Sequence, residues 1–211
     1  GIGDYESSIA NYRHALEMFS GLGNDHGVAV CNVNLGSVYL SLSKYDSALA
    51  YSLNARRMFD ATGYVRFGAV ATGNAGIALG KLGDSQRGVE YLKKAIELHK
   101  KNNAAKELSY CYLKLAELYA DINESANALN YANKALDASL GAGVLQQVSD
   151  THRLLALLYA SQGDFRKAFE AHRAYAETKD SLYHHDKIKY VREFQVEYDT
   201  QKKERELAAT A

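Results

Sequence analysis

The chain has 211 residues, of which 24% are charged and 47% are hydrophobic, and its formal net charge is zero. Balanced charge gives no electrostatic reason to expect nucleic acid or an anionic membrane as the partner. No apolar run approaches the roughly 20 residues needed to cross a bilayer, and no signal peptide is visible, so we expect no direct membrane insertion by this segment.

A short stretch recurs along the chain at an interval of 40 residues, first as GDYESSIANYRHAL at 3–16 and next as SKYDSALAYSLNAR at 43–56. A period in this range is typical of stacked helical units rather than of one globular core. The complete lack of proline suits long helices, because proline inside a helix costs about 3 kcal/mol. An all-α repeat array is therefore expected. Its five copies begin at Gly3, Ser43, Gly83, Asn123 and Gly163.

Residues 1–22 hold only the second helix of a first, truncated repeat, so we expect the natural protein to extend further toward its N-terminus. Each later period contains two helical patterns. The first helix carries a small residue followed three positions later by a large one, as at Gly36 and Tyr39. The second helix has one apolar face at the helical spacing i, i+3, i+4 and i+7. In the first complete pair this face is formed by Ala48, Tyr51, Ser52 and Ala55.

Residues that tolerate left-handed backbone mark the end of each second helix. They are Gly23, Gly63, Asn103 and Gly143, again 40 residues apart. The next equivalent position is Tyr183, which breaks the series. We therefore expect four complete helix pairs over 23–180, followed by a separate capping or linker helix within 181–211. Its apolar stripe, expected to pack on the last pair, is Val191, Phe194 and Tyr198.

The two cysteines, Cys31 and Cys111, are two periods apart and occupy equivalent positions, with Ala71 and Thr151 at the other copies. This pattern indicates a small buried slot, since a free cysteine packs as a small hydrophobe. A disulfide between them would have to reach across two stacked repeats, beyond the Cα separation of about 7 Å that a disulfide allows.

The repeated residues resemble the tetratricopeptide repeat, whose first helix carries Leu-Gly-x-x-Tyr and whose second carries Ala-x-x-x-(large)-x-x-Ala. Here Leu35-Gly36-x-x-Tyr39 and Leu115-Ala116-x-x-Tyr119 match the first of these. The usual period is about 34 residues, so 40 residues resemble the longer-repeat branch. The resemblance implies a right-handed α-solenoid of antiparallel helix pairs, closed by the C-terminal helix. It also implies a concave inner face, lined by first helices, that binds a peptide or protein.

The run Tyr198-Asp199-Thr200-Gln201-Lys202-Lys203-Glu204 resembles the segment that joins a tetratricopeptide sensor to a membrane span in bacterial sensor histidine kinases and related regulators. That resemblance implies a ligand-sensing role in a two-component system. It favours a periplasmic over a cytoplasmic location, as the extracytoplasmic part of a membrane protein. The C-terminal helix is also the candidate surface for a homodimer. The alternative is an assembly scaffold or adaptor without a signalling role.

The sequence contains no nucleophile–base motif, phosphate loop or paired metal signature, so we expect neither an enzyme nor a cofactor. His152 and His172 lie on the two helices of one pair. A packing contact is favoured there over a metal site, because structural zinc needs four ligands and no third is evident.

The resemblance implies that an asparagine on the first helix holds the backbone of a peptide, because its amide offers both a donor and an acceptor. The alternative role is a hydrogen bond to the backbone of the next repeat. The carboxylate clamp of chaperone adaptors is not expected, because Val33, Ser37, Val70 and Gly73 stand where its polar and basic residues would be. The candidate peptide-binding residues are Asn34, Asn74 and Lys114 in one row, with Tyr110, Glu117 and Arg153 beside it.

Overall fold

The computed structural model describes residues 2–62 and 65–184, and these residues form helices joined by short turns, with no strand among them. Helix α1 (Ile2–Gly21) comes first and is followed by four helix pairs. The predicted all-α solenoid is confirmed. The first helices of the pairs are α2 (Asp25–Ser41), α4 (Val65–Lys81), α6 (Ala105–Asp121) and α8 (Leu145–Ser161). The second helices are α3 (Tyr45–Thr62), α5 (Ser85–Lys101), α7 (Ser125–Gly141) and a helix over 165–184, called the C-terminal helix below.

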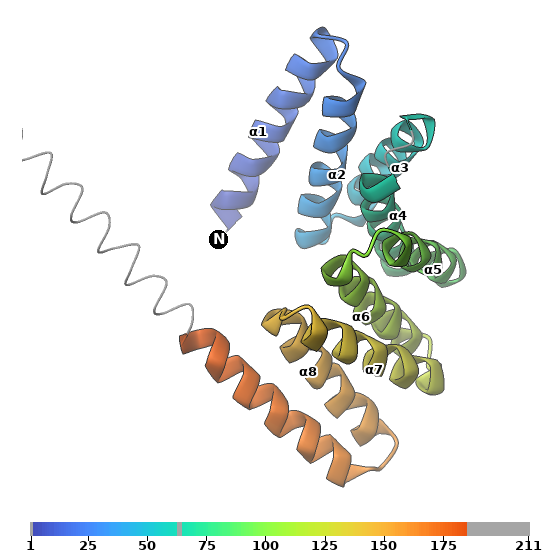
Figure 1. Cartoon of the computed structure of the whole chain (residues 1–211), viewed down its shortest axis with the longest axis vertical. Helices are drawn as coiled ribbons and strands as arrows, with labels where there is room; N and C mark the ends of the chain where they lie inside the picture. Colours follow the sequence, from blue (N-terminus) through green and yellow to red (C-terminus); the bar gives the residue numbers. More distant parts are fainter. Residues whose placement is uncertain (1, 63–64, 185–211) are drawn as a thin grey trace, which may run out of the picture.

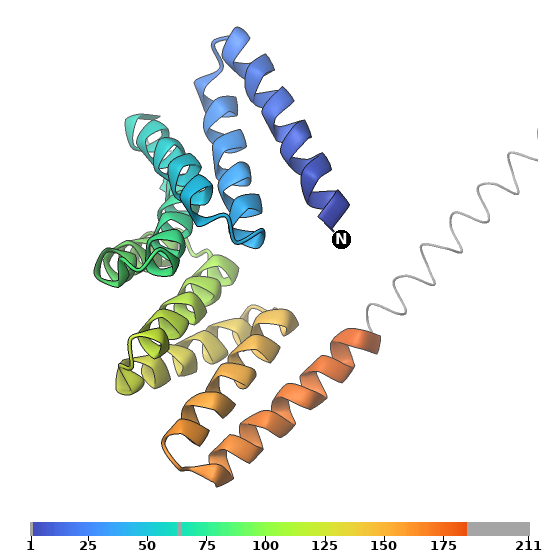
Figure 2. The same ribbon diagram turned by 180° about the vertical axis from the view of Figure 1, so that it is seen from behind.

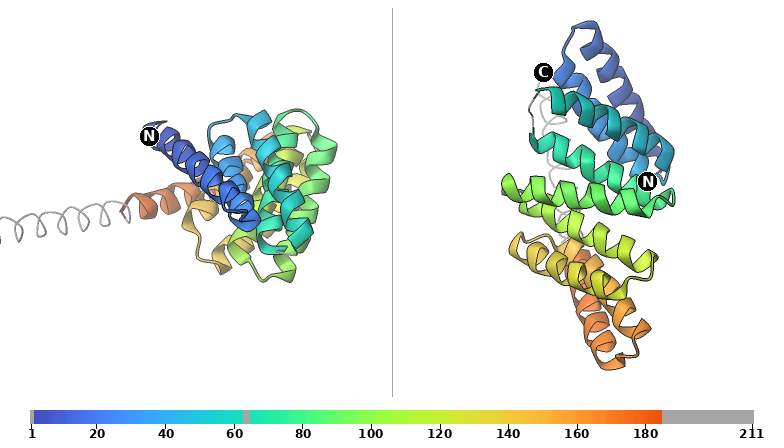
Figure 3. Two further views of the ribbon diagram at one scale, coloured as in Figure 1. Left: turned by 90° about the horizontal axis from the view of Figure 1, so that it is seen from above. Right: turned by 90° about the vertical axis from the view of Figure 1, so that its right-hand side faces the viewer.

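The helices follow a curved path, and α1 and the C-terminal helix lie on the open side of the arc (Figures 1 and 2). Figure 3 shows the same stack from two further sides. Each labelled helix packs on the next along the chain, and the first helices also touch each other from pair to pair. The backbones of the second helices α3, α5 and α7 do not approach one another in this way, and α3 reaches α5 through a long side chain, with a hydrogen bond of 2.7 Å from Arg56 Nη1 to the hydroxyl of Tyr91. The first helices therefore form the inner, shorter side of the arc and the second helices the outer side.

The turns between helices use left-handed backbone at the predicted positions. Ser43 and Asn123 have φ angles of 56° and 61°, and Gly83 and Gly163, at the same place in the repeat, have 92° and 78°. The second series behaves alike at Gly23, Asn103 and Gly143, while Gly63 lies outside the described residues. Only Gly3 differs from its equivalents, because α1 already includes it. Asparagine and glycine suit these angles because they visit the left-handed region at low cost.

Small residues let the two helices of a pair approach closely. A Cβ atom on Gly36 would lie 2.6 Å from Ser52 Oγ, and one on Gly76 would lie 2.9 Å from the backbone nitrogen of Leu92. Ala116, at the equivalent position, is fully buried. The predicted small slot on the first helix is therefore a contact between the two backbones of the hairpin.

The cysteine prediction is also confirmed. Cys31 and Cys111 are both buried free thiols, and the equivalent Ala71 and Thr151 are buried as well. Burial in an apolar slot raises the pKa of both thiols, because it removes water from the thiolate, and it raises that of Cys111 to about 12.

A separate helix was expected to begin near residue 181, and this prediction is wrong for the described residues 181–184. The C-terminal helix begins at residue 165 and runs through 181–184 without a break, so Tyr183 ends no helix. The lack of a glycine or asparagine at this position explains the difference, since nothing there stops a helix. Val191, Phe194 and Tyr198, which were expected to pack on the last pair, lie outside the described residues.

Candidate functional site

A groove with a volume of about 570 Å³ lies on the inner side of the arc. It crosses the first helices obliquely. It takes in the C-terminal half of α2, most of α4, the N-terminal two thirds of α6 and the first turn of α8, and Tyr45 on α3 and His99 on α5 also line it. Ser37 and Ser41 mark its start on α2, and Gln147 marks its end on α8. The sequential twist of the pairs accounts for this course, because equivalent residues of successive helices do not remain at the same depth.

Apolar side chains form much of the groove wall, including Leu40, Val70, Ile77 and Cys111. Tyr110 also lines it and is 37% exposed. Burial raises the pKa of the Tyr110 hydroxyl, so this group is protonated at neutral pH and can donate a hydrogen bond. An apolar wall with a few placed polar groups is typical of ligand-binding clefts.

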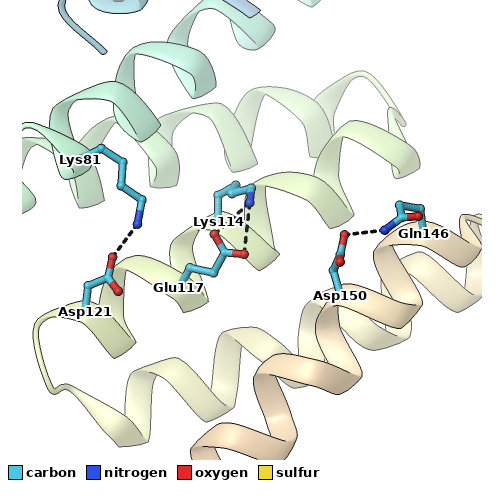
Figure 4. A network of polar contacts seen from close by, with 6 residues as sticks. All are labelled: Lys81, Lys114, Glu117, Asp121, Gln146 and Asp150. Atoms are coloured by element: carbon cyan, nitrogen blue, oxygen red, sulfur yellow. Dashed lines mark hydrogen bonds and ion pairs between the residues drawn. The ribbon is translucent and has the colours of Figure 1, made fainter. Parts of the chain in front are cut away.

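Charged residues along the groove are mostly held in pairs (Figure 4). Lys81 Nζ on α4 lies 2.8 Å from Asp121 Oδ2 on α6, and this hydrogen bond is the main reason that the pKa of Lys81 is raised. Lys114 Nζ lies 2.9 Å from Glu117 Oε2, one turn along α6. Such pairs between partly exposed groups contribute about 0–1 kcal/mol each to stability. Their main effect on the groove is to leave it close to electrically neutral.

Four of the six sequence-predicted residues meet in this groove. Asn74, Tyr110, Lys114 and Glu117 line it together, with Lys114 Nζ 5.4 Å from the centre of the Tyr110 ring. The structure places the other two elsewhere. Asn34, on α2, is half-buried, and Arg153, on α8, is exposed, and neither is among the residues that line the groove.

Asn74 does not make the hydrogen bond to the backbone of the next repeat that was one of its two roles considered from the sequence. Its side chain is 6% exposed, and its Nδ2 donates a hydrogen bond of 2.8 Å to Ser37 Oγ on the first helix of the preceding pair. The partner is thus a side chain of the previous repeat, not the backbone of the next one. The Asn74 amide carbonyl remains available as an acceptor at the groove.

Several groove residues have no counterpart among the sequence predictions, and His99 is the most unusual of them. Its side chain is 1% exposed and lines the groove, and Nδ1 has no hydrogen-bond partner among the described residues. Burial is the main cause of its lowered pKa, and the nearby Arg66 acts in the same direction. A comparison with Phe59, one period earlier, could have identified it, because a histidine stands there in an aromatic position.

The histidines considered for a metal do not form such a site in the described part of the chain. His172 is exposed, with its ring centre 5.9 Å from that of Tyr175 on the same helix. Over residues 2–62 and 65–184, no three histidine, cysteine or acidic side chains come together in a way that could hold a metal ion. Among the same residues, no helix combines the length and the apolar character that a membrane span requires.

Comparison with known proteins identifies the repeat. Two family models described as tetratricopeptide repeat match residues 2–61 and 72–102. A curated relative from Arabidopsis thaliana, protein KINESIN LIGHT CHAIN-RELATED 2, is 23% identical over 194 residues. That match covers 86% of this chain but only 29% of the relative's length.

Solved structures with similar folds include BtubC (BKLC) from P. vanneervenii, with a TM-score of 0.73, 19% identity and coverage of 86% of this chain and 75% of that one. Another is the Signal Transduction ATPase with Numerous Domains protein PH0952 from Pyrococcus horikoshii, which has a tetratricopeptide repeat sensor. It aligns with a TM-score of 0.68, 15% identity and coverage of 85% of this chain and 28% of that one. At these identities the likeness concerns the fold alone.

Proposed function

Because this chain belongs to the tetratricopeptide repeat family, a protein-binding fold, we propose that it binds an extended peptide segment in its inner groove, without catalysis. We propose further that this binding serves ligand sensing in a bacterial signal-transduction protein. The observation that carries the proposal is the groove itself. It runs across four first helices, which gives an extended chain room to contact several repeats at once.

The chemistry of the groove suits a peptide. Its apolar wall can bury ligand side chains, while the Asn74 carbonyl and the Tyr110 hydroxyl can hydrogen-bond to a peptide backbone. Polar groups of this kind fix the orientation of a bound chain, and the apolar surface supplies most of the binding free energy.

Peptide binding can be tested with a displayed library of random dodecapeptides, followed by calorimetry on the selected sequences. We expect Tyr110→Ala to weaken the binding of a selected peptide about tenfold or more, since it removes an aromatic wall of the groove. Lys94→Ala is the matched control, because Lys94 is exposed on the outer helix α5. Equal affinities for wild type and Tyr110→Ala would place the binding site outside the groove and refute the proposal.

The sensing role draws support from the tetratricopeptide repeat sensor of PH0952 and from the resemblance of the tail at 198–204 to sensor linkers. The backbones of the first helices approach one another from pair to pair while those of the outer helices do not, so a ligand that prefers one groove width would change the curvature of the array. Amide exchange over 165–211, measured with and without the selected peptide, tests this role. Exchange that is unchanged by a saturating peptide would leave the scaffold function as the better description.

The scaffold alternative is favoured by one observation. The curated relative is named for kinesin light chains, and the name indicates no sensor. A scaffold needs the same groove but no coupling between the groove and the C-terminal helix, so the exchange experiment distinguishes the two functions.

A further inference from the structure

Helix α5, the second helix of the second pair, contains a buried polar side chain at a position where the two preceding copies of the repeat have an aromatic one. Phe19, Phe59 and His99 are 40 residues apart. Phe59 is 2% exposed and packs with Ala29 and Ala71 in an apolar cluster, and His99 is 1% exposed in the equivalent slot. In the second pair an imidazole thus fills a buried slot that an aromatic hydrocarbon fills in the first pair.

One ring nitrogen of His99 has no partner within the described part of the chain. Its Nδ1 is shielded from solvent and has no hydrogen-bond partner. The two charged groups that act on the pKa of His99, Glu107 and Arg66, form an ion pair with each other, with 3.5 Å between Glu107 Oε1 and Arg66 Nη2. A buried polar group without a partner is unfavourable, and native proteins retain few of them. The next copy shows the usual solution, because buried Ser139 donates from its Oγ to the carbonyl of Leu136 at 3.0 Å.

His99 lines the inner groove, whereas its equivalent Phe59 does not. The unusual residue and the cavity therefore coincide. Because Nδ1 is shielded from water in the free protein, a new hydrogen bond to this nitrogen, formed as neighbouring groove side chains move aside, would replace no bond to solvent. Such a bond would therefore be formed at little desolvation cost on the protein side.

The charges of the groove favour an uncharged ligand group at this point. Lys81 and Lys114 are already paired with Asp121 and Glu117. Lys106, also at the groove, is exposed to solvent. A charged ligand side chain would have to break an existing pair or lose its own hydration in a mostly apolar space, and both changes are unfavourable.

We propose that the peptide ligand anchors in the groove through an uncharged hydrogen-bonding side chain, namely serine, threonine, asparagine, glutamine or tyrosine, which pairs with the imidazole of His99. This inference rests on the proposed peptide-binding function and names the residue that sets its specificity. The same slot filled by phenylalanine would select an apolar anchor instead.

The test is a parallel selection of the same random dodecapeptide display library on the wild-type chain, on His99→Phe and on His172→Phe. His99→Phe installs the residue found at position 59, so we expect it to fold with an equal or higher melting temperature. Wild type and His172→Phe, whose changed residue is exposed, should enrich the five polar side chains at one peptide position. His99→Phe should replace them with phenylalanine, leucine or methionine, and should bind the wild-type peptides about tenfold more weakly.

Two outcomes overturn the proposal in different ways. If wild type and His99→Phe enrich the same side chains, His99 does not determine which peptide side chain is bound. The peptide-binding function itself would remain supported. No enriched peptide on any of the three proteins would contradict the peptide-binding function and this inference with it.

Discussion

The side-chain amide of Asn74 donates a hydrogen bond of 2.8 Å to Ser37 Oγ and thereby joins α4 to α2 at the edge of the groove. Ser37 Oγ also lies 3.1 Å from the carbonyl oxygen of Val33, to which it donates, so the serine is held from both sides. The bond links the first helices of two successive pairs, which are the helices that set the curvature of the inner side.

We expect Asn74→Ala to affect both stability and binding. The lost hydrogen bond should lower the free energy of unfolding by about 1 kcal/mol, and the lost amide carbonyl should weaken binding of a selected peptide by up to about tenfold. Asn34→Ala is the matched control, because Asn34 occupies the same place in the repeat but does not line the groove. Urea unfolding and calorimetry check the two effects, and an equal loss of binding in both variants would contradict this assignment.

Gly76→Ala should destabilise the protein by about 1–3 kcal/mol, because overpacking in a closely packed interior forces neighbours apart. The new Cβ would lie 2.9 Å from the Leu92 nitrogen and 3.0 Å from Tyr91 Cβ, and a backbone atom cannot yield as a flexible side chain does. Gly141→Ala provides the comparison, since α7 ends there with no heavy atom of a neighbouring segment within 4 Å. That change should be neutral or stabilise by up to about 1 kcal/mol. Similar urea midpoints for the two variants would be inconsistent with the close approach of α4 and α5.

Acid should destabilise the fold through His99. Burial, its largest cause, and the nearby Arg66 lower the pKa of the folded-state imidazole below its ordinary value of 6.5, while Glu107 acts in the opposite direction. Between the folded and unfolded pKa values, the unfolded chain therefore binds more protons, and stability falls as the pH drops below about 6.5. His99→Phe should show a flatter decline in melting temperature between pH 7 and pH 5.

His152 also has a pKa lowered by burial and contributes with the same sign, so the informative quantity is the difference between wild type and His99→Phe. Parallel melting curves against pH in the two proteins would show that His99 is as easily protonated in the folded state as in the unfolded one.

Both thiols should resist labelling in the folded protein. A pKa of about 12 leaves about one Cys111 side chain in ten thousand as thiolate at pH 8, and the residue is 3% exposed. Reaction with a chromogenic disulfide reagent should therefore require unfolding, and its extent in urea should follow the loss of helical circular dichroism. Complete labelling of either thiol within seconds under native conditions would contradict the buried slot.

Much of the fold was accessible from the sequence because each local signal recurs at the same place in the repeat. Ser43 and Asn123 were recognisable as turn residues only through their alignment with Gly83 and Gly163, and all four adopt left-handed angles. A repeat thus provides its own controls, and the physical reason is simple. Every pair packs on its neighbours in the same way, so each position meets the same environment.

The site was only partly predictable for the same reason. Asn34 and Asn74 are equivalent in the repeat, yet only Asn74 lines the groove, because the groove crosses the helices at an angle. Periodicity identifies the inner face but not the part of each helix that a ligand can reach. A comparison with Phe59 could have singled out His99, but its role depends on the cavity beside it, which is a property of three-dimensional packing.

Each helix pair packs mainly on its neighbours, and this arrangement determines how the protein unfolds. Among the labelled helices, α1 and α2 make no contact with α7 or α8, so an array of this kind can unfold from either end one pair at a time. The groove is the exception, since an occupant would touch α2, α4, α6 and α8 together. Such an occupant would connect the four pairs along the array. The central pairs would then unfold together in one cooperative transition rather than one after another. A sharper thermal transition would then report occupancy as clearly as a higher midpoint does.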